Sequence, residues 1–293
     1  MRGAFARVTT ELIDTDERVV ALLGDIGVFA FRHAKEAHPD RVYNIGILEQ
    51  STIGLGAGLA KGGLIPVIHT IAPFLVERAL EQIKIDFAYQ QLPGNLVSVG
   101  ASVDYAALGC THHCPGDVGI LSNVPGVQIL VPGTAAEFES LYRQTYANAS
   151  LTYTRISELV NADSSDVEPG RIEVLRTGAQ ACVVAFGPVK DAVLEACADA
   201  DVTVLYCTSV QPFDAATLRA HAGSGRILLV EPFYEYSTAP AVLSALQGLP
   251  AAIASTGIPR EFLRGYGSVD DHYEAIGLTP RGIRASLDRL IDG

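Results

Sequence analysis

Short runs of apolar and β-branched residues alternate with longer helical patterns along the whole chain. In the first half these runs predict strands at Val19–Leu23, Ile65–His69, Leu96–Gly100, Val127–Val131 and Thr152–Ile156. Most of these runs are largely apolar, which is typical of strands covered on both faces. Continuous apolar strands separated by helices therefore predict a parallel sheet with helices on either side.

Two helices of the first half have the clearest signals. Within Leu75–Gln91, apolar residues recur at three- and four-residue spacing, at Leu75, Ala79, Leu80, Ile83 and Phe87. In the stretch from Thr134 to Ala147, Thr134 predicts the N-cap, and Glu137 three residues later predicts a capping box. Residues 1–12 lack the apolar core of a secretion signal and predict a further helix.

A polar, acidic segment with proline and glycine, Asn161–Gly170, is the best linker in the sequence. After it the pattern restarts. Strands are predicted at Cys182–Phe186, Val202–Tyr206 and Ile227–Val230. Helices are predicted at Val189–Ala200, Ala215–His221, Thr238–Gln247 and Pro280–Ile291. We therefore expect two α/β domains with parallel sheets, residues 1–160 and 171–293, joined by residues 161–170.

The composition narrows the class of protein. Of 293 residues, 48% are hydrophobic and 18% charged, which excludes a disordered chain, and some surface is expected to be covered by partners. The formal charge of −12, without clustered Lys and Arg, argues against nucleic-acid binding. Prolines and glycines interrupt the longest uncharged stretch, so no membrane span is predicted. Five cysteines in a chain this long predict no disulfide framework, and we expect a cytoplasmic protein.

The most informative stretch for chemistry is Val42–Ala60, in which Glu49 is the only charged residue. Two interpretations are open. A buried Glu49 would need a hydrogen-bond partner, because an isolated carboxylate is costly to bury. Alternatively, Glu49 lies at a helix N-terminus, where the helix dipole favours it, and points to water. Gly54, Gly56 and Gly58 follow, and they suit close approach of the backbone to another helix or to a ligand.

Two further segments carry polar groups. The sequence Cys110-Thr-His-His-Cys114 has the residue types of a zinc site, but there is no second pair of ligands, so no metal is expected. It is interpreted either as a loop with one catalytic histidine or as a polar loop without a role. Asp25 follows the first predicted strand, where parallel sheets place binding loops, and His69 ends another strand.

Together these segments resemble the thiamine diphosphate enzymes of the transketolase group. The resemblance begins with MRGAF, VVALLGDIG and HPDRVYNIGILEQ, and it continues through IGLGAGLAKGGLIPVIHT, FLVERALEQIK, GCTHHCPGD and NVPGVQILVPGTAAEF. In the second half, CVVAFGPV, VTVLYCTSVQPFD and ILLVEPF resemble the C-terminal domain of that group. The resemblance implies a pyrimidine-binding domain followed by a transketolase C-terminal domain.

A full-length transketolase also has a domain that holds the cofactor diphosphate and Mg²⁺ through a Gly-Asp-Gly motif, and that motif is not found here. The resemblance therefore implies the smaller subunit of a split transketolase. A separate chain is expected to carry the diphosphate domain and most of the Mg²⁺ ligands. The expected assembly is α2β2, with this chain inactive alone.

The resemblance also implies roles for individual residues. Glu49 matches the glutamate that hydrogen-bonds the aminopyrimidine ring, and His112 matches a histidine expected near the substrate carbonyl or hydroxyls. The ring is expected to rest on Phe74 (Phe87 and Tyr89 are the alternatives), with Ile47 and Asp25 also on the cofactor side. His69, His113 and Arg78 are expected to contact the sugar or sugar-phosphate substrate.

Several positions depart from the family pattern. Leu108 stands where the family has an aspartate that contacts a sugar hydroxyl, and Phe29 stands where it has a serine near the sugar phosphate. The loss of these contacts suggests an acceptor other than a standard pentose phosphate. The alternative functions are the β subunit of a 2-oxo acid dehydrogenase, which shares the domain pair, and a non-catalytic scaffold subunit.

Overall fold

A computed structural model describes residues 1–293, and its first half is built on a seven-stranded sheet. The strand order is β10-β5-β6-β4-β3-β1-β2, and all neighbours are parallel except β10 and β5. The strands are β1 (Val19–Leu23), β2 (Val42–Asn44), β3 (Ile65–Ile71), β4 (Gly94–Val99), β5 (Val127–Leu130), β6 (Leu151–Arg155) and β10 (Ser209–Gln211). The predicted parallel sheet is confirmed, with one antiparallel strand at its edge.

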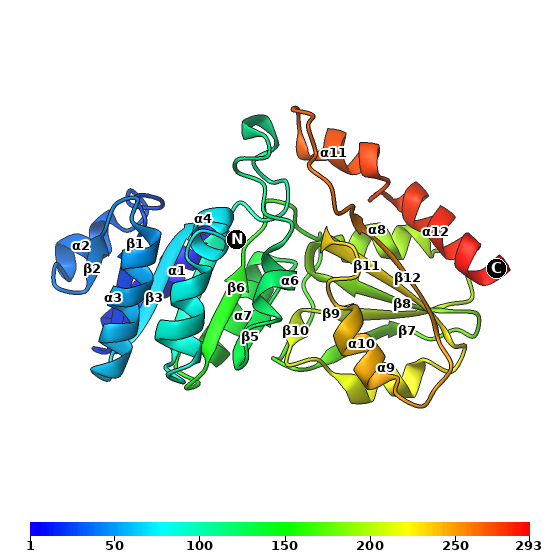
Figure 1. Cartoon of the computed structure of the whole chain (residues 1–293), viewed down its shortest axis with the longest axis horizontal. Helices are drawn as coiled ribbons and strands as arrows, with labels where there is room; N and C mark the ends of the chain where they lie inside the picture. Colours follow the sequence, from blue (N-terminus) through cyan, green and yellow to red (C-terminus); the bar gives the residue numbers. More distant parts are fainter.

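Helices cover both faces of this sheet (Figure 1). They are α1 (Arg2–Thr15), α2 (Arg32–Ala37), α3 (Glu49–Lys61), α4 (Ala72–Val76), α5 (Leu80–Gln82), the π-helix η1 (Ile83–Ala88), α6 (Asp117–Leu121) and α7 (Ala135–Thr145). Alternate residues of β1 show the two-sided burial. Val20 and Leu22 belong to the apolar cluster under α3, whereas Val19, Ala21 and Leu23 belong to the cluster under α1 and α7.

The second half contains a five-stranded sheet of order β12-β11-β8-β9-β7, in which only β7 is antiparallel to its neighbour. Its strands are β7 (Ile172–Arg176), β8 (Cys182–Phe186), β9 (Thr203–Cys207), β11 (Arg226–Tyr234) and β12 (Ala252–Ile258). Its helices are α8 (Lys190–Ala196), α9 (Ala215–His221), α10 (Ala239–Ala245), α11 (Val269–Ile276) and α12 (Pro280–Asp292). The two sheets lie side by side in Figure 1.

The two halves share one hydrophobic core. A cluster of 35 buried apolar residues includes Val20 and Ile68 of the first sheet as well as Val184 and Leu229 of the second. The strand β10 comes from the second half of the sequence but pairs with β5 of the first sheet. The halves are therefore joined by backbone hydrogen bonds as well as by apolar contact.

Two predicted details differ in the structure. The helix expected over Leu75–Gln91 is divided into α4, α5 and η1, with a turn at residues 77–79. The predicted N-cap is correct, since Thr134 Oγ1 accepts from the Glu137 amide at 3.1 Å. The Glu137 carboxylate does not complete a capping box, because it accepts instead from the Gly133 amide and the Tyr206 hydroxyl, each at 2.7 Å.

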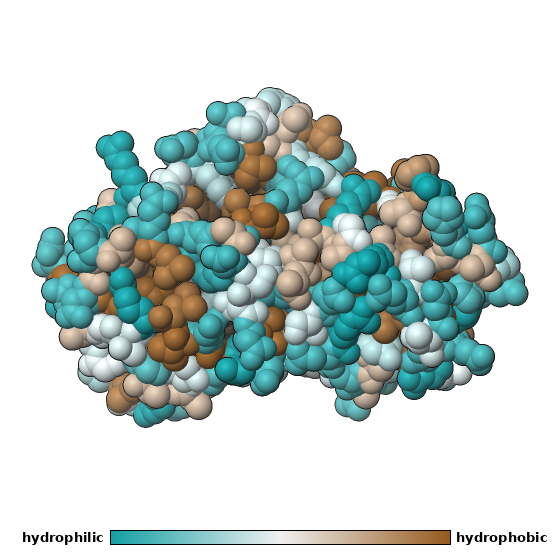
Figure 2. Space-filling view, turned by 180° about the vertical axis from the view of Figure 1, so that it is seen from behind, coloured by the Kyte–Doolittle hydropathy of each residue, from teal (hydrophilic) through white to brown (hydrophobic).

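No helix of the structure is long and apolar enough to span a bilayer. On the face seen in Figure 2, polar side chains cover much of the surface, and an apolar area lies over the C-terminal half on the left. The crest at the top of the same view is formed by two projecting loops, where apolar and polar side chains are mixed.

Candidate active site at the carboxyl edge of the first sheet

Neighbouring strands β4, β3, β1 and β2 run parallel, so their carboxyl ends meet along one edge of the sheet. Parallel sheets place their ligand sites at this edge. The chain leaves β1 at Gly24, and Asp25 follows. It leaves β2 at Asn44, and the next segment leads to Glu49. It leaves β3 at Ile71, and Phe74 lies in the helix that follows. The loop after β4 carries His112 and His113. Strand direction thus brings together segments that are far apart in the sequence.

Glu49 is the first residue of α3, and only 3% of its surface is exposed. Both interpretations of this residue were partly right, because it lies at a helix N-terminus and is nevertheless buried. Its Oε2 accepts a hydrogen bond from Arg78 Nη1 at 2.8 Å, whereas Oε1 is buried and has no partner. A buried carboxylate oxygen without a donor is costly, so a ligand that offers a hydrogen at this point would relieve that cost.

Phe74 lies between Arg78 and His112. The Arg78 guanidinium carbon is 4.2 Å from the centre of the Phe74 ring, and the His112 ring meets Phe74 edge-on with 5.3 Å between centroids. His112 is half-buried, and its Nδ1 is 3.0 Å from Thr111 Oγ1, which leaves Nε2 for another group. A carboxylate, an aromatic wall and an imidazole therefore form one continuous row.

Asp25 occupies the turn after β1 with a left-handed backbone, φ 58°. Asn44 at the end of β2 holds this turn, because its side chain accepts from the Asp25 amide and donates to Asp25 Oδ1, both at 3.0 Å. Asn44 Oδ1 also accepts from the Gly46 amide at 3.2 Å, in the segment that leads to the exposed Ile47. The sequence did not single out Asn44, although an amide side chain directly after a strand is a recognisable turn signal.

His69 is fully buried within β3, which continues to Ile71 and does not end at His69 as predicted. Its Nδ1 is 2.8 Å from the Val97 carbonyl oxygen, its ring lies 4.6 Å from the Phe5 ring, and Nε2 has no partner. Burial lowers the pKa of His69 to about 4, so the imidazole is neutral at physiological pH. The structure does not place His69 against Glu49, Phe74 or His112, and its contact with substrate stays a prediction.

His113 faces the second half of the chain. It is buried, and its ring meets that of His272 on α11 edge-on, with 5.1 Å between centroids. Burial, with a smaller contribution from His272, lowers the pKa of His113. His112 and His113 are thus adjacent in sequence but lie in different surroundings, and His112 is the one beside Phe74.

Two acidic residues near this loop were not predicted from the sequence. Asp104 is buried, and it accepts hydrogen bonds from Ser157 Oγ at 3.0 Å and from the Glu158 amide at 2.9 Å. Burial raises the pKa of Asp104 to about 7. Glu77, next to Arg78, is 3.7 Å from Cys114 Sγ, and partial burial raises its pKa. Asp104 belongs to no motif. Glu77 lies within the segment FLVERALEQIK, but nothing in that segment singled it out.

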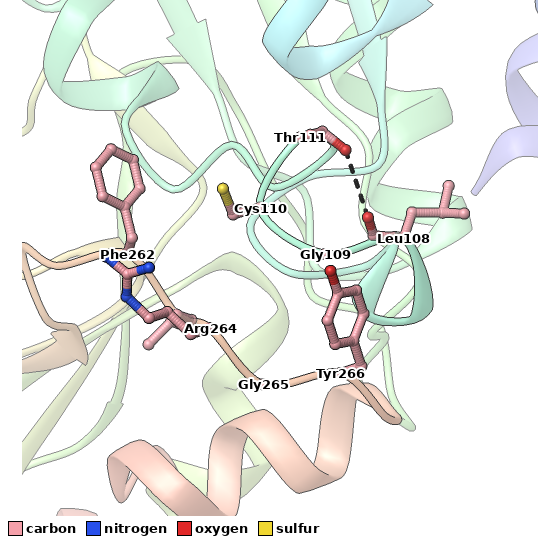
Figure 3. Close-up of a pocket in the computed structure, with 9 residues that line it drawn as sticks. Leu108, Gly109, Cys110, Thr111, Phe262, Arg264, Gly265 and Tyr266 are labelled. Atoms are coloured by element: carbon pink, nitrogen blue, oxygen red, sulfur yellow. Dashed lines mark hydrogen bonds between the residues drawn. The ribbon is translucent and has the colours of Figure 1, made fainter.

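A cavity of about 320 Å³ lies beside the His112 loop, between Leu108–Thr111 of the first half and Phe262–Tyr266 of the second (Figure 3). Tyr266 is 73% exposed and its ring approaches Gly109, where an added Cβ would lie 2.7 Å from Tyr266 Cε1. Arg264 is the only charged side chain in the lining. Residues from both halves therefore shape the approach to His112.

The candidate site contains a free carboxylate oxygen but no cluster of metal-ligating side chains. Within residues 1–293, no three His, Cys, Asp or Glu side chains come together as a metal site would need. Cys110 is exposed whereas Cys114 is buried, so the Cys-Thr-His-His-Cys segment does not converge on one point. The unpartnered Glu49 Oε1, in contrast, fits a ligand that carries a hydrogen-bonding nitrogen, and the Phe74 ring lies on the other side of the Arg78 guanidinium.

Family models identify the chain on both sides of the segment at 161–169. Residues 1–158 match the transketolase pyrimidine binding domain, and residues 170–283 match the transketolase C-terminal domain. The fold and these matches define a two-domain α/β chain that combines a pyrimidine binding domain with a transketolase C-terminal domain. The chain belongs to the transketolase family.

Individual relatives resemble the chain over nearly its full length. An uncharacterized 33.6 kDa protein in the fasciation locus of Rhodococcoides fascians is 38% identical, with 99% of this chain and 95% of that protein covered. One of the subunits of apulose-4-phosphate transketolase from Phocaeicola vulgatus is 29% identical, with 96% and 94% covered. A solved structure described as a split gene transketolase, an inactive β4 tetramer, is 26% identical with a TM-score of 0.85, and 99% and 97% of the two chains are covered.

Proposed function

We propose that this chain is the subunit of a split, thiamine diphosphate-dependent transketolase that carries the pyrimidine-binding half of the active site. With a partner subunit it transfers a two-carbon ketol unit from a ketose to an aldehyde. The observation that supports this most directly is Glu49, a buried carboxylate with one oxygen free of any partner, which Arg78 links to Phe74 and through it to His112. Similarity to one chain of an apulose-4-phosphate transketolase supports a carbohydrate substrate.

Thiamine diphosphate supplies, when bound, a nucleophilic carbon and an electron sink. Glu49 Oε1 would hold the aminopyrimidine by a hydrogen bond to its ring nitrogen, and the low polarity around the buried carboxylate would strengthen that bond. We assign Phe74 and Ile47 as apolar surface for the ring, and Asp25, in the turn held by Asn44, as a further residue on the cofactor side. His112 Nε2 gives a proton to, or takes one from, an oxygen of the substrate.

The diphosphate and Mg²⁺ are assigned to a partner chain. Mg²⁺ prefers carboxylate, carbonyl and phosphate oxygens in octahedral geometry, and the residues at this edge of the sheet present no such cluster. The similar structure described as an inactive β4 tetramer supports the view that chains of this kind need a different subunit for activity. We propose an α2β2 assembly in the cytoplasm.

Reconstitution tests the proposal. The chain is mixed with its copurifying subunit that bears the Gly-Asp-Gly motif, with thiamine diphosphate, Mg²⁺ and a panel of ketose donors and aldehydes. We expect ketol transfer by the mixture and none by either chain alone. Glu49→Gln is expected to lower kcat by about 10²–10⁴-fold, whereas the exposed control Glu81→Gln leaves it unchanged.

Three results would contradict the proposal. Full-rate turnover by the isolated chain would exclude a shared active site. Release of CO₂ from a 2-oxo acid, without ketol transfer, would instead support the β subunit of a 2-oxo acid dehydrogenase, and a mixture that binds no cofactor would support a scaffold.

A further inference from the structure

Arg78 connects three groups of the candidate site. It lies in the turn between α4 and α5, where its Nη1 donates to Glu49 Oε2 at 2.8 Å while its guanidinium stacks on Phe74 at 4.2 Å. Phe74 in turn contacts His112. The Arg78 side chain is 41% exposed, whereas that of Glu49 is 2% exposed, so Arg78 reaches the carboxylate from the solvent side.

A buried glutamate with no fixed partner can rotate its carboxylate and present either oxygen. The ion pair with Arg78 removes this freedom, because Oε2 is occupied and Oε1 alone is left. Stacking on Phe74 fixes the guanidinium in turn, since cation–π contact favours a position over the ring face. Arg78 also supplies the countercharge that a buried carboxylate requires.

We propose that Arg78 is a positioning residue for Glu49: it directs a single carboxylate oxygen, Oε1, toward the aminopyrimidine and does not bind the substrate. This inference rests on the proposed function. It replaces the expectation that Arg78 contacts substrate, because the guanidinium is already engaged by Glu49 and Phe74.

The isolated chain provides the first test, a double-mutant cycle of urea unfolding. Arg78→Met leaves the buried Glu49 carboxylate unpaired and is expected to lower the unfolding midpoint by roughly 0.5–1 M. In the double variant with Glu49→Gln this loss largely disappears, because no buried charge remains. Arg32 is the matched control, since it stacks on Phe29 at 4.1 Å but has no carboxylate partner in the structure. Additive effects of the Glu49 and Arg78 substitutions would overturn the proposal.

The reconstituted complex provides the second test. We expect Arg78→Met to slow exchange of the bound cofactor's C2 proton for deuterium at least tenfold and to lower kcat, while the KM for the ketose donor stays within twofold. Arg78→Lys keeps the charge and is expected to recover most of the exchange rate. Arg32→Met should leave the exchange rate and kcat unchanged.

The alternatives give different results. A raised donor KM with a normal C2 exchange rate would show that Arg78 binds substrate, and the proposal would be wrong. An unchanged exchange rate in Glu49→Gln would show instead that the proposed function itself is wrong, and the positioning role would fall with it.

Discussion

Asp104 is the residue whose ionisation the surrounding structure changes most plainly within the measurable pH range. It lies on the loop that leads to His112, and its carboxyl is buried beneath Ser157 and Glu158. The raised pKa, about 7, means that folding favours the protonated form. The stabilising contribution of this proton is complete below the ordinary carboxyl range, near pH 4, and it is lost as the pH rises to about 7.

We therefore expect Asp104 to make the chain less stable at pH 7.5 than at pH 5, with a slope of up to about 1.4 kcal/mol per pH unit between the two pKa values. Asp104→Asn removes the titration, and its amide can donate to Ser157 Oγ while its oxygen accepts from the Glu158 amide. The free energy of unfolding of this variant, measured in urea at both pH values, should show a flatter pH dependence.

The control for this prediction is Asp166→Asn, since the Asp166 side chain is 89% exposed. It should leave the pH dependence unchanged. An Asp104→Asn variant with the same slope as the parent chain would show that other groups cause the pH dependence.

At the scale of single residues, the sequence indicated which side chain has a chemical role better than it indicated which groups that side chain contacts. Glu49 was recognisable as the only charge in an apolar stretch, and the structure confirms that it is buried. Its partner Arg78 could not be predicted as such, because the two residues are 29 positions apart and meet only through the turn after α4. Asp104 and Asn44 were missed for the same reason, since each acquires its surroundings from a segment that is distant in the sequence.

Helix α3 shows how glycine placement fixes one element against another. Gly56 faces the sheet, where an added Cβ would lie 2.6 Å from Ile68 Cδ1 and 3.3 Å from Phe87 Cζ. Gly58 is exposed, and an added Cβ would meet nothing within 4 Å. The two glycines are in the same helix, so alanine substitutions at these two positions can be compared directly.

We expect Gly58→Ala to stabilise the isolated chain by about 1 kcal/mol, because alanine has the higher helix propensity. Gly56→Ala should gain the same propensity but lose more through overpacking, for a net loss of about 1 kcal/mol. Urea unfolding of the two variants checks this. Equal stabilisation by both substitutions would mean that α3 can move away from β3.

The predicted elements were most accurate where apolar residues are continuous. Val19–Leu23, Cys182–Phe186 and Ala215–His221 match β1, β8 and α9 at both ends. Within the divided helix, four of the five predicted buried positions are correct, since Leu75, Ala79, Ile83 and Phe87 are fully buried. The fifth, Leu80, is only partly buried. The spacing of apolar residues reports burial, but it does not report the turn at residues 77–79 that exposes Arg78.

The strands that were missed share a short length or a mixed composition. β2 and β10 have three residues each, and β12 is exposed at its first residue. Their pairing comes from neighbours supplied by tertiary structure, so a local pattern is too weak to indicate them.

For the whole molecule, Arg155 provides a buried polar link between the two halves. This residue of β6 is fully buried, and it donates to Asp117 Oδ2 at 2.7 Å, to Ser102 Oγ at 2.7 Å and to the carbonyl of Pro232 at 3.1 Å. Pro232 belongs to β11 of the second half. One side chain therefore connects the core of the first sheet to a strand of the second.

Removal of one partner from a buried ion pair costs more than the pair contributes, because the other charge is left without compensation. We expect Arg155→Leu to destabilise the chain by about 3–5 kcal/mol and to separate one unfolding transition into two. Calorimetry measures both effects. The surface arginine Arg284 is the control, and a comparable loss in Arg284→Leu would show that burial is not the cause.

The antiparallel pairing of β10 with β5 affects what happens when the backbone is cut between the halves. The segment Asn161–Gly170 is polar, but Asn161 is buried and its amide donates to the Gly187 carbonyl oxygen at 3.0 Å. A protease that cleaves in its exposed part, at residues 162–164, would leave two fragments that still share a sheet edge and a common core. The nicked protein should therefore elute as a single particle until denaturant releases its pieces.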